Sequence, residues 1–314
     1  MNHYIDLAIY NKCNNRCLIC TNPTDFFSES NFSYYYQKNF LERLKKINPK
    51  SLKEISLTGG EPTLHPDFFG ILDYIRNYFP KTHITLLTNG RSFYYRNFTK
   101  KLWRYKNISV EVSLFGNNPA THDLITRTKG SFKQTVSGLE NLLFLRNSLK
   151  KQEVGVRIVI CRSNLSAISK IIKFLKNNFI TLNRVILIFM EYEGQAIVNR
   201  KKVAINYQDV APVLKQIKKE ISLFPEFRLY HFPLCMIDSY FWPYVWRTLP
   251  DYETVFLPEC ERCQLKKYCL GFHKGYLKHQ KEPRIKPFLN LDKISIKKSN
   301  SLYHPIISVY DKEN

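Results

Sequence analysis

Near its N-terminus the chain reads His3-Tyr4-Ile5-Asp6-Leu7-Ala8-Ile9-Tyr10-Asn11-Lys12-Cys13-Asn14-Asn15-Arg16-Cys17-Leu18-Ile19-Cys20, so that three cysteines follow a short apolar–polar alternation. The alternation predicts a strand over residues 3–10, with the cysteines in the loop that leaves it. The spacing Cys-x3-Cys-x2-Cys lets the thiolates face one point, which favours a metal centre over disulfides. Iron–sulfur clusters normally take four cysteines, so three indicate a cluster with one iron open to a ligand. A structural zinc site, which usually needs four closed ligands, is the alternative.

The length and composition are those of a globular protein with a sizeable core. At 314 residues and 44% hydrophobic content, the chain fits one large domain, or one with a small appendage. No apolar run approaches the roughly 18 residues of a membrane-spanning helix, and the first residues lack a basic region followed by an apolar core. We therefore expect a cytoplasmic protein with no membrane partner. Eight cysteines in that reducing compartment favour metal ligands or catalytic groups.

The chain is strongly basic, with 48 Lys and Arg against 26 Asp and Glu and a net charge of +22. Such a charge is compatible with nucleic acid, an anionic membrane surface or an acidic peptide as partner. The lysines are scattered, however, in pairs such as Lys45-Lys46, Lys150-Lys151 and Lys297-Lys298. No arginine-rich stripe or nucleic-acid motif stands out. Biased codon usage enriches Lys, Asn, Ile, Tyr and Phe together in the same way, and a nucleic-acid partner is not favoured.

Strand-like and helix-like patterns alternate about six times over residues 3–225. Several predicted strands, notably Val185-Ile186-Leu187-Ile188-Phe189-Met190, are continuously apolar, as strands covered on both faces should be. This alternation predicts an α/β fold with a parallel sheet and crossover helices. The predicted strands cover residues 3–10, 53–57, 84–87, 108–114, 154–160, 184–190 and 227–231, and the predicted helices cover residues 33–47, 67–79, 95–102, 131–145, 165–177 and 208–223.

The candidate reactive residues all lie just after predicted strands. They are Cys13 to Cys20, Gly59 to Pro62, Asn89, Ser113 and Glu191. In a β/α barrel the carboxyl ends of the strands form one rim, and the loops on that rim build the active site. The coincidence predicts an enzyme.

The turn Gly59-Gly60-Glu61-Pro62 follows the second predicted strand. Its two glycines allow the backbone to approach a ligand closely. The carboxylate of Glu61 can receive an ammonium group, and Pro62 stiffens the turn. Taken alone, an ordinary strand-to-helix turn explains the same residues equally well.

From about residue 232 the pattern changes to a loop-rich segment with prolines and cysteines. We predict three parts: a barrel over residues 1–231, a small metal-held unit over residues 232–282 and a basic tail over residues 283–314. Cys161 ends an apolar strand outside this segment, and we expect it to be a buried small hydrophobe. The cysteines of the second part are Cys235, Cys260, Cys263 and Cys269.

The cysteine loop and the glycine turn together resemble the radical S-adenosylmethionine enzymes. Cys13, Cys17 and Cys20 match the signature of that superfamily, and Gly59-Gly60-Glu61-Pro62 matches its motif for the methionine amino group. The resemblance covers roughly residues 3–225 and implies a partial six-fold, TIM-like β/α barrel. It also implies a 4Fe–4S cluster whose open iron binds S-adenosylmethionine. Reductive cleavage of that cofactor yields a 5′-deoxyadenosyl radical, which abstracts hydrogen from a substrate.

The same resemblance implies further cofactor contacts. It places ribose or carboxylate contacts near Ser113 and at Arg127, although a turn residue and a solvated charge explain these two equally well. The family usually has an aromatic residue before the third cysteine, where this chain has Ile19. An apolar side chain can still pack beside the adenine.

The second cysteine group resembles the auxiliary-cluster extension called SPASM, or its shorter Twitch relative. The spacing Cys260-x2-Cys263-x5-Cys269 matches, but His273 stands where the full pattern has another cysteine. The cysteines are too few for two auxiliary clusters, so the resemblance implies one auxiliary 4Fe–4S cluster on Cys235, Cys260, Cys263 and Cys269. A zinc site on these four cysteines, and His273 as an alternative ligand, stay open.

Several phrases resemble the maturases of the His-Xaa-Ser peptide system, among them Leu86-Leu87-Thr88-Asn89-Gly90-Arg91 and Pro233-Leu234-Cys235. The resemblance implies modification of a ribosomally made precursor peptide, with Glu191 as a substrate or cofactor contact or else a strand-end charge. It also implies a one-electron donor of the flavodoxin or ferredoxin type, and it allows a partner maturase. The alternatives are a radical enzyme acting on RNA or a small molecule, and a non-enzymatic electron carrier or metal-stapled binding protein.

Overall fold

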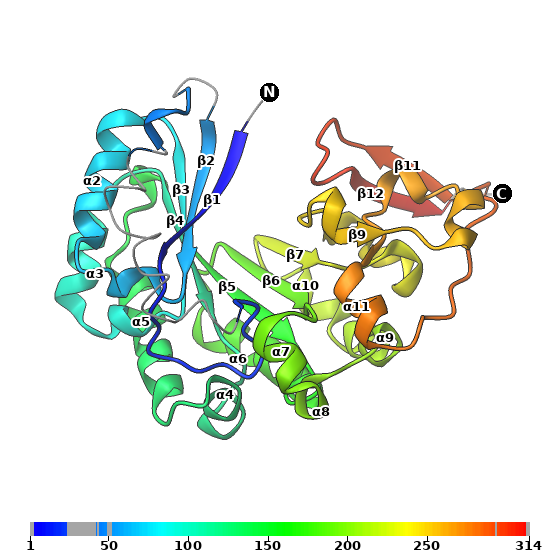
Figure 1. The fold of residues 1–314 in the computed structure, drawn as a ribbon, viewed down its shortest axis with the longest axis horizontal. Coiled ribbons are helices and arrows are strands. Elements are labelled where there is room, and N and C mark those ends of the chain that lie inside the picture. Colours follow the sequence, from blue (N-terminus) through cyan, green and yellow to red (C-terminus); the bar gives the residue numbers. More distant parts are fainter. Residues whose placement is uncertain (1–2, 24–41, 43, 49–51, 293, 312–314) are drawn as a thin grey trace.

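The computed structural model describes residues 3–23, 42, 44–48, 52–292 and 294–311. Eight strands form one sheet, in which each strand pairs in parallel with the next along the chain. The sheet is curled and carries helices on its outer side (Figure 1). This arrangement confirms the predicted α/β partial barrel. The strands are β1 (His3–Tyr10), β2 (Leu52–Gly59), β3 (His83–Thr88), β4 (Ile108–Ser113), β5 (Gln152–Ile160), β6 (Arg184–Phe189), β7 (Glu226–Tyr230) and β8 (Val245–Trp246).

Four of the predicted helices are found nearly as expected, as α2, α3, α5 and α6. The helix predicted over residues 33–47 lies largely outside the described residues. The helix predicted over residues 208–223 is divided at Ile217, whose ψ of 8° leaves the helical range. None of the helices within the described ranges is long and apolar enough to cross a membrane. The helices are α2 (Phe68–Tyr78), α3 (Arg96–Leu102), α4 (Pro119–Thr126), α5 (Ser131–Leu145), α6 (Ile168–Asn178), α7 (Gly194–Val198), α8 (Arg200–Val203), α9 (Tyr207–Gln216), α10 (Lys218–Ile221) and α11 (Lys274–His279).

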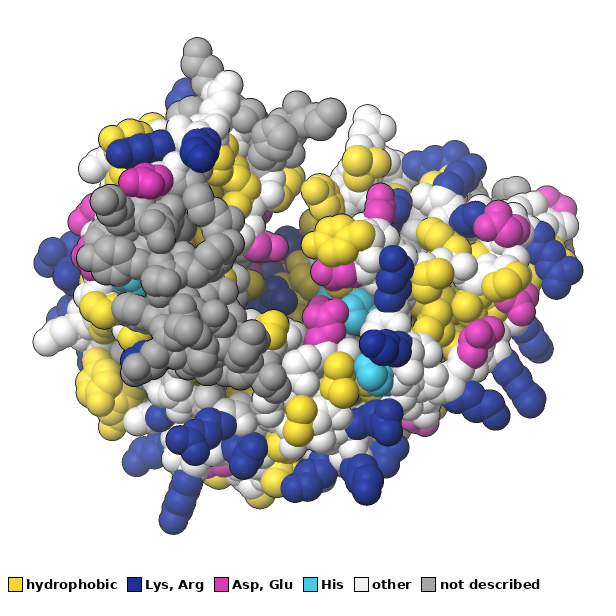
Figure 2. All heavy atoms as spheres, viewed as in Figure 1, with side chains coloured by type: hydrophobic (Ala, Val, Ile, Leu, Met, Phe, Trp, Pro, Cys, Tyr) yellow, Lys and Arg dark blue, Asp and Glu magenta, His cyan; other side chains and the backbone are white. Residues whose placement is uncertain are grey.

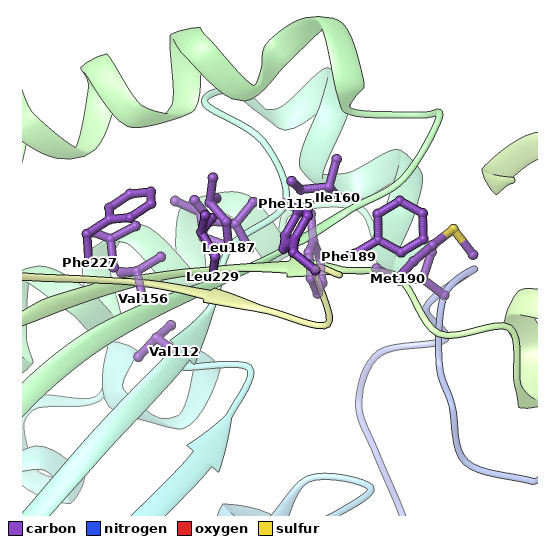
Figure 3. Packing of buried hydrophobic residues seen from close by; sticks show 14 of the residues in the cluster. Val112, Phe115, Val156, Ile160, Leu187, Phe189, Met190, Phe227 and Leu229 are labelled. Carbon is purple, nitrogen blue, oxygen red and sulfur yellow. The ribbon is translucent and has the colours of Figure 1, made fainter. Parts of the chain in front are cut away.

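The central strands are buried on both faces, as their unbroken apolar sequence predicts. Leu187 and Phe189 of β6 lie in the main core, and Figure 3 shows both pointing to the same side of the sheet. Ile186 and Ile188 alternate with them and form a separate buried cluster with Tyr230 of β7 on the other face. The inner face of the half-barrel is therefore partly apolar.

A buried ion pair crosses the inner sheet from β4 to β6. Arg184 lies 3.1 Å from Glu111 and also pairs with Glu226 of β7. The strand between them carries Gly155 in register with both partners. A Cβ on that glycine would stand 2.3 Å from the Glu111 carboxylate, so the missing side chain allows the two charges to meet. Burial raises the pKa of Glu111, and the charge of Arg184 opposes that rise.

The chain after β7 forms a smaller extension that shares the sheet of the barrel. The short strand β8, which was not predicted, pairs in parallel with β7. Two antiparallel pairs follow, β9 (Thr254–Val255) with β10 (Phe272–His273) and β11 (Ile294–Lys298) with β12 (Ile306–Asp311). The second pair lies in the segment predicted as a tail. The division into three parts at residues 231 and 282 stays a prediction.

We expect removal of the buried cation to cost more stability than removal of the whole pair. Arg184→Met leaves the Glu111 carboxylate buried without its partner, which costs about 3–5 kcal/mol. The double variant Arg184→Met/Glu111→Met also removes the buried carboxylate. The two carboxylates that then lack Arg184, Glu153 and Glu226, are partly exposed to water, so the double variant should recover most of that loss. Urea unfolding of the two variants and the unchanged protein measures the difference. Equal losses in the single and double variants would show that the pairing is not what holds these strands.

Candidate active site

The three N-terminal cysteines lie in the loop after β1, at the carboxyl edge of the sheet. All are free thiols, and none is fully exposed. Burial raises the pKa of Cys13 to about 12, with the charge of Glu61 adding to the rise. Burial also raises the pKa of Cys17, and the nearby thiols of Cys13 and Cys20 add to it. The three sulfurs therefore lie close enough to interact, in a place where a cationic centre would favour their thiolate forms.

A cluster and a single metal ion require different arrangements of these ligands. Among the described residues, no three His, Cys, Asp or Glu side chains are grouped as a single ion requires. A 4Fe–4S cluster takes one thiolate on each of several irons, so its ligands need not converge on one atom. The ligand role of Cys13, Cys17 and Cys20 stays a prediction.

The cysteine loop is held between two parts of the barrel that are far apart in sequence. On one side, the backbone of Leu18 donates to the carbonyl of Ile125, at the end of α4, at 2.8 Å. On the other side, the carbonyl of Cys20 accepts from the backbone of Gln195 in α7, also at 2.8 Å. Neither α4 nor α7 was predicted, so this support for the loop was missed.

The glycine turn packs against the backbone that leaves β1. Gly60 donates to the carbonyl of Tyr10 at 2.7 Å, and Glu61 donates to that of Lys12 at 2.8 Å. Gly59 has φ of 138°, where other residues are strained. A Cβ on Gly60 would stand 2.4 Å from the Lys12 carbonyl. The glycines are therefore needed first for contact between the two motifs.

The Glu61 carboxylate is turned inward and accepts four hydrogen bonds. Oε1 accepts from the backbone and hydroxyl of Thr63 and from the hydroxyl of Thr88, and Oε2 accepts from the backbone of Asn89 at 2.7 Å. Burial raises the pKa of Glu61, and these donors oppose the rise. Pro62 begins the short turn that follows. The carboxylate thus joins the end of β2 to the end of β3.

Arg91, to which the sequence analysis gave no role, links the end of β3 to the cysteine loop. Its guanidinium donates to the carbonyl of Asn14 and to the side chain of Asn15, the latter at 2.8 Å. Gln134 of α5 accepts from the same guanidinium at 2.7 Å. Asn89 adds a side-chain bond to Asn14 at 2.6 Å. The position after a predicted strand signalled Asn89, whereas Arg91 appeared only in the phrase that resembles the His-Xaa-Ser maturases.

The remaining predicted cofactor contacts lie on the same rim. Ser113 ends β4, half-buried, and is in register with Arg157 of β5. Arg127 follows α4 with a left-handed backbone, and its side chain is exposed. The residue before it, Thr126, accepts a backbone bond from Arg16 of the cysteine loop.

Glu191 lies after β6 in a group of carboxylates and imidazoles. Its Oε1 is 3.3 Å from Nδ1 of His231, which also faces the carbonyl of Phe189 at 3.2 Å. Burial lowers the pKa of His231 to about 3, so that its ring is neutral. Burial raises the pKa of Glu191. Glu193, two residues further on, contacts Nε2 of His273 at 3.2 Å.

The four cysteines of the extension line one small enclosed pocket with apolar neighbours such as Leu234, Phe256 and Phe272. Burial raises the pKa of Cys235, and the other three thiols add to the rise. The backbones of Leu234 and Gly271 donate to the sulfur of Cys269, both at 3.4 Å. Cys161 is fully buried in the barrel core, as predicted. The four grouped residues are Cys235, Cys260, Cys263 and Cys269.

A curled parallel sheet with its reactive loops on the carboxyl rim defines a half-barrel enzyme. The sequence model of the Radical SAM superfamily matches residues 7–175, more than half of the chain, and the chain belongs to that superfamily. Membership implies a 4Fe–4S cluster and S-adenosylmethionine as cofactors and removes the non-enzymatic interpretation. The more specific resemblance to His-Xaa-Ser maturases stays a prediction.

Two curated relatives carry different activities in their names. The chain is 28% identical over 190 residues to a GTP 3′,8-cyclase of Nautilia profundicola, a match that covers 60% of this chain and 57% of the cyclase. It is 25% identical over 158 residues to the mycofactocin maturase MftC of Mycolicibacterium smegmatis, covering 50% of this chain and 38% of the maturase. The match thus spans little more than half of the cyclase and less than half of the maturase.

Solved structures with the same fold include two that hold peptides. SuiB of Streptococcus suis bound to its precursor peptide SuiA has a TM-score of 0.57 at 14% identity, over 72% of this chain and 48% of SuiB. The enzyme anSMEcpe with AdoMet and the Kp18Cys peptide has a TM-score of 0.52 at 16% identity, over 91% of this chain and 94% of the other. These likenesses show the shared fold.

We expect Arg91→Ala to loosen the cysteine loop. The substitution removes charge-assisted bonds to Asn14 and Asn15, each worth about 1.5–3 kcal/mol, so the reconstituted variant should lose iron to a chelator at least about tenfold faster. Arg96→Ala is the matched control, because Arg96 is exposed and its guanidinium lies over the Phe144 ring. Equal rates of iron loss in the two variants would contradict the role of Arg91.

Proposed function

We propose that this chain is a peptide maturase, a radical enzyme that takes a hydrogen atom from a ribosomally made precursor peptide. The radical part rests on one observation, the backbone pairing of Gly60 with Tyr10 and of Glu61 with Lys12. That pairing joins the predicted cluster ligands to the predicted cofactor turn. The peptide part is supported by the names of SuiB, anSMEcpe and MftC. It is also supported by the hollow between barrel and extension that Figure 2 shows, which carries acidic and histidine side chains on one wall.

The residues present fit the cofactors that the superfamily uses. Cys13, Cys17 and Cys20 would hold three irons of the cluster and leave the fourth open. The Gly59–Pro62 turn would receive the methionine amino group through its backbone, because the Glu61 carboxylate already has four donors. Ser113 and Arg127 remain candidates for the ribose and the carboxylate. When bound, these cofactors supply a 5′-deoxyadenosyl radical.

Glu191 is the proposed substrate contact. It follows β6, and the segment that continues from it contacts His273 of the extension through Glu193 and the cysteine loop through the backbone of Gln195. Its raised pKa suits a carboxyl group that accepts a hydrogen bond or a proton from the substrate. His231 lies within hydrogen-bond reach and is neutral, so it orients Glu191 without neutralising it.

A nucleotide is the second candidate substrate. The observation in its favour is the name of the cyclase relatives. Arg157 and Arg228 on the inner strands β5 and β7 would be the phosphate contacts in that case. Arg228 is already bound to Glu226 at 2.6 Å, which leaves Arg157 as the principal candidate. The three phosphate groups of GTP would need more cations than Arg157 alone supplies, so we place the peptide first.

The four cysteines of the extension are proposed to hold one auxiliary 4Fe–4S cluster. Such a cluster suits an oxidation, because it can accept the electron left after hydrogen abstraction and bond formation. A zinc site on the same residues is the alternative. The Nε2 atom of His273 is already in contact with Glu193, which favours the four cysteines over His273 as ligands.

We expect the reconstituted protein, with a reductant and S-adenosylmethionine, to form 5′-deoxyadenosine and to remove two hydrogens from a synthetic His-Xaa-Ser peptide. Cys13→Ala should abolish both products. Glu191→Gln should retain 5′-deoxyadenosine and lose the peptide product by about 10²-fold. The control Cys161→Ala changes a buried cysteine outside both groups and should retain both products. Liquid chromatography with mass spectrometry measures them together.

Two outcomes would change this proposal. If GTP is consumed with formation of 5′-deoxyadenosine while the peptide is untouched, the nucleotide candidate replaces the peptide. If no 5′-deoxyadenosine forms although iron and sulfide are fully loaded, the radical chemistry itself is contradicted.

We expect the variant Cys13→Ala/Cys17→Ala/Cys20→Ala to retain about four irons per chain, because an auxiliary cluster takes all its ligands from the extension. Adding Cys235→Ala to this variant should remove that iron. Metal analysis after anaerobic reconstitution measures both. Retained zinc with no iron in the first variant would contradict the auxiliary cluster.

A further inference from the structure

Exposed apolar and basic side chains gather on α7 and α8. Ile197 and Val198 are 37% and 68% exposed, and Arg200, Lys201 and Lys202 follow them, all exposed. We call these five residues the α7–α8 surface. No acidic residue interrupts the chain from residue 194 to residue 204, so the surface sets two exposed apolar side chains beside three successive cations.

The α7–α8 surface lies directly on the cysteine loop. Gln195 donates to the carbonyl of Cys20 at 2.8 Å, and the side chain of Asn199 donates to the carbonyl of Leu18 at 3.3 Å. At Gly194 the approach is so close that a Cβ would stand 2.2 Å from the carbonyl of Asn22. One layer of backbone therefore separates this surface from the loop that carries the predicted cluster ligands.

Other elements extend the positive charge around this surface. Arg16 is exposed on the cysteine loop itself. Burial lowers the pKa of His279, and the charges of Lys278 and Arg200 lower it further. Arg200 of α8 therefore lies near the end of α11. Figure 2 shows Lys and Arg side chains with hydrophobic ones along its lower edge, where Figure 1 places α4 and α8. The nearest carboxylate along the chain, Glu193, is engaged by His273.

We propose that the α7–α8 surface docks an acidic one-electron carrier protein, which reduces the cluster held by Cys13, Cys17 and Cys20. This inference rests on the proposed radical function. The carrier loses one electron and the cluster gains one, and no atom moves between them. Encounters of this kind use small interfaces, and opposite charges speed them by steering the two proteins together.

The chemistry of this surface fits such a carrier better than a nucleic acid or the substrate peptide. Residues 194–204 include no aromatic side chain on which a base could stack. The surface is the outer side of two short helices, whereas the hollow proposed for the peptide lies between the barrel and the extension (Figure 2). Only an electron has to pass through the intervening layer of backbone.

The test compares two reductants on the fully reconstituted protein. In Arg200→Glu/Lys201→Glu/Lys202→Glu, 5′-deoxyadenosine formation driven by a reduced bacterial flavodoxin should fall at least about tenfold, because steering is reversed. Formation driven by dithionite, which needs no docking, should stay unchanged. For the unchanged protein, the flavodoxin-driven rate at limiting flavodoxin should also fall as salt is raised.

The matched control is Lys170→Glu/Lys173→Glu/Lys176→Glu. It makes the same change in net charge on the exposed face of α6, and it should leave both rates unchanged. An equal loss with flavodoxin in the control would attribute the effect to total charge and overturn the proposal. So would equal losses with both reductants in the α7–α8 variant, or no loss at all. Absence of product with dithionite in the unchanged protein would instead contradict the proposed function.

Discussion

Two backbone hydrogen bonds, from Gly60 to Tyr10 and from Glu61 to Lys12, hold the reactive edge of this protein together. They require two segments of the chain to approach more closely than a side chain at Gly60 would allow. A Cβ at Gly60 would stand only 2.4 Å from the Lys12 carbonyl, so only glycine fits there. The cysteine loop cannot take its position without the glycine turn. The buried Glu61 carboxylate then fixes the turn to β3 through Thr88 and Asn89. Three successive strands thus end in one connected site.

The sequence was informative wherever the periodicity of apolar residues or the spacing of cysteines determines the structure. It predicted seven of the eight strands of the sheet, because burial on both faces leaves a local apolar pattern. The resemblance to auxiliary-cluster extensions implied that Cys235 belongs with Cys260, Cys263 and Cys269; the four line one pocket, and their role as ligands stays a prediction. The sequence missed α4, α7 and α8, because helices this short show little apolar periodicity. It could not give Arg91 its partners or turn Glu61 inward, since both depend on which loops meet after folding. The glycines were expected to approach a ligand, whereas their nearest neighbours are the backbone of Tyr10 and Lys12.

The two halves of the molecule meet through paired carboxylates and imidazoles. Glu191 contacts His231 at the end of β7, and two residues later Glu193 contacts His273 in the extension. Burial lowers the pKa of His273, but Glu193 and the neighbouring carboxylates outweigh this and raise it. His231 and His273 are therefore chemically different although both are buried. One short segment after β6 touches the cysteine loop, the barrel and the extension.

The net charge of the chain does not describe the charges near the reactive rim. The total is +22, yet the carboxyl groups of Glu61, Glu191 and Glu193 stand near the reactive rim. These carboxylates act on a group bound at the rim more strongly than the distant lysines do, because nearby buried charges are screened less than distant exposed ones. The lysines act on the outside, where they attract acidic partners over longer distances. At α7 the two kinds of charge come close together along the chain, because Glu193 directly precedes this helix and Arg200, Lys201 and Lys202 follow it. The proposed docking of an acidic carrier therefore depends on the local charge of α8 and not on the total charge of the molecule.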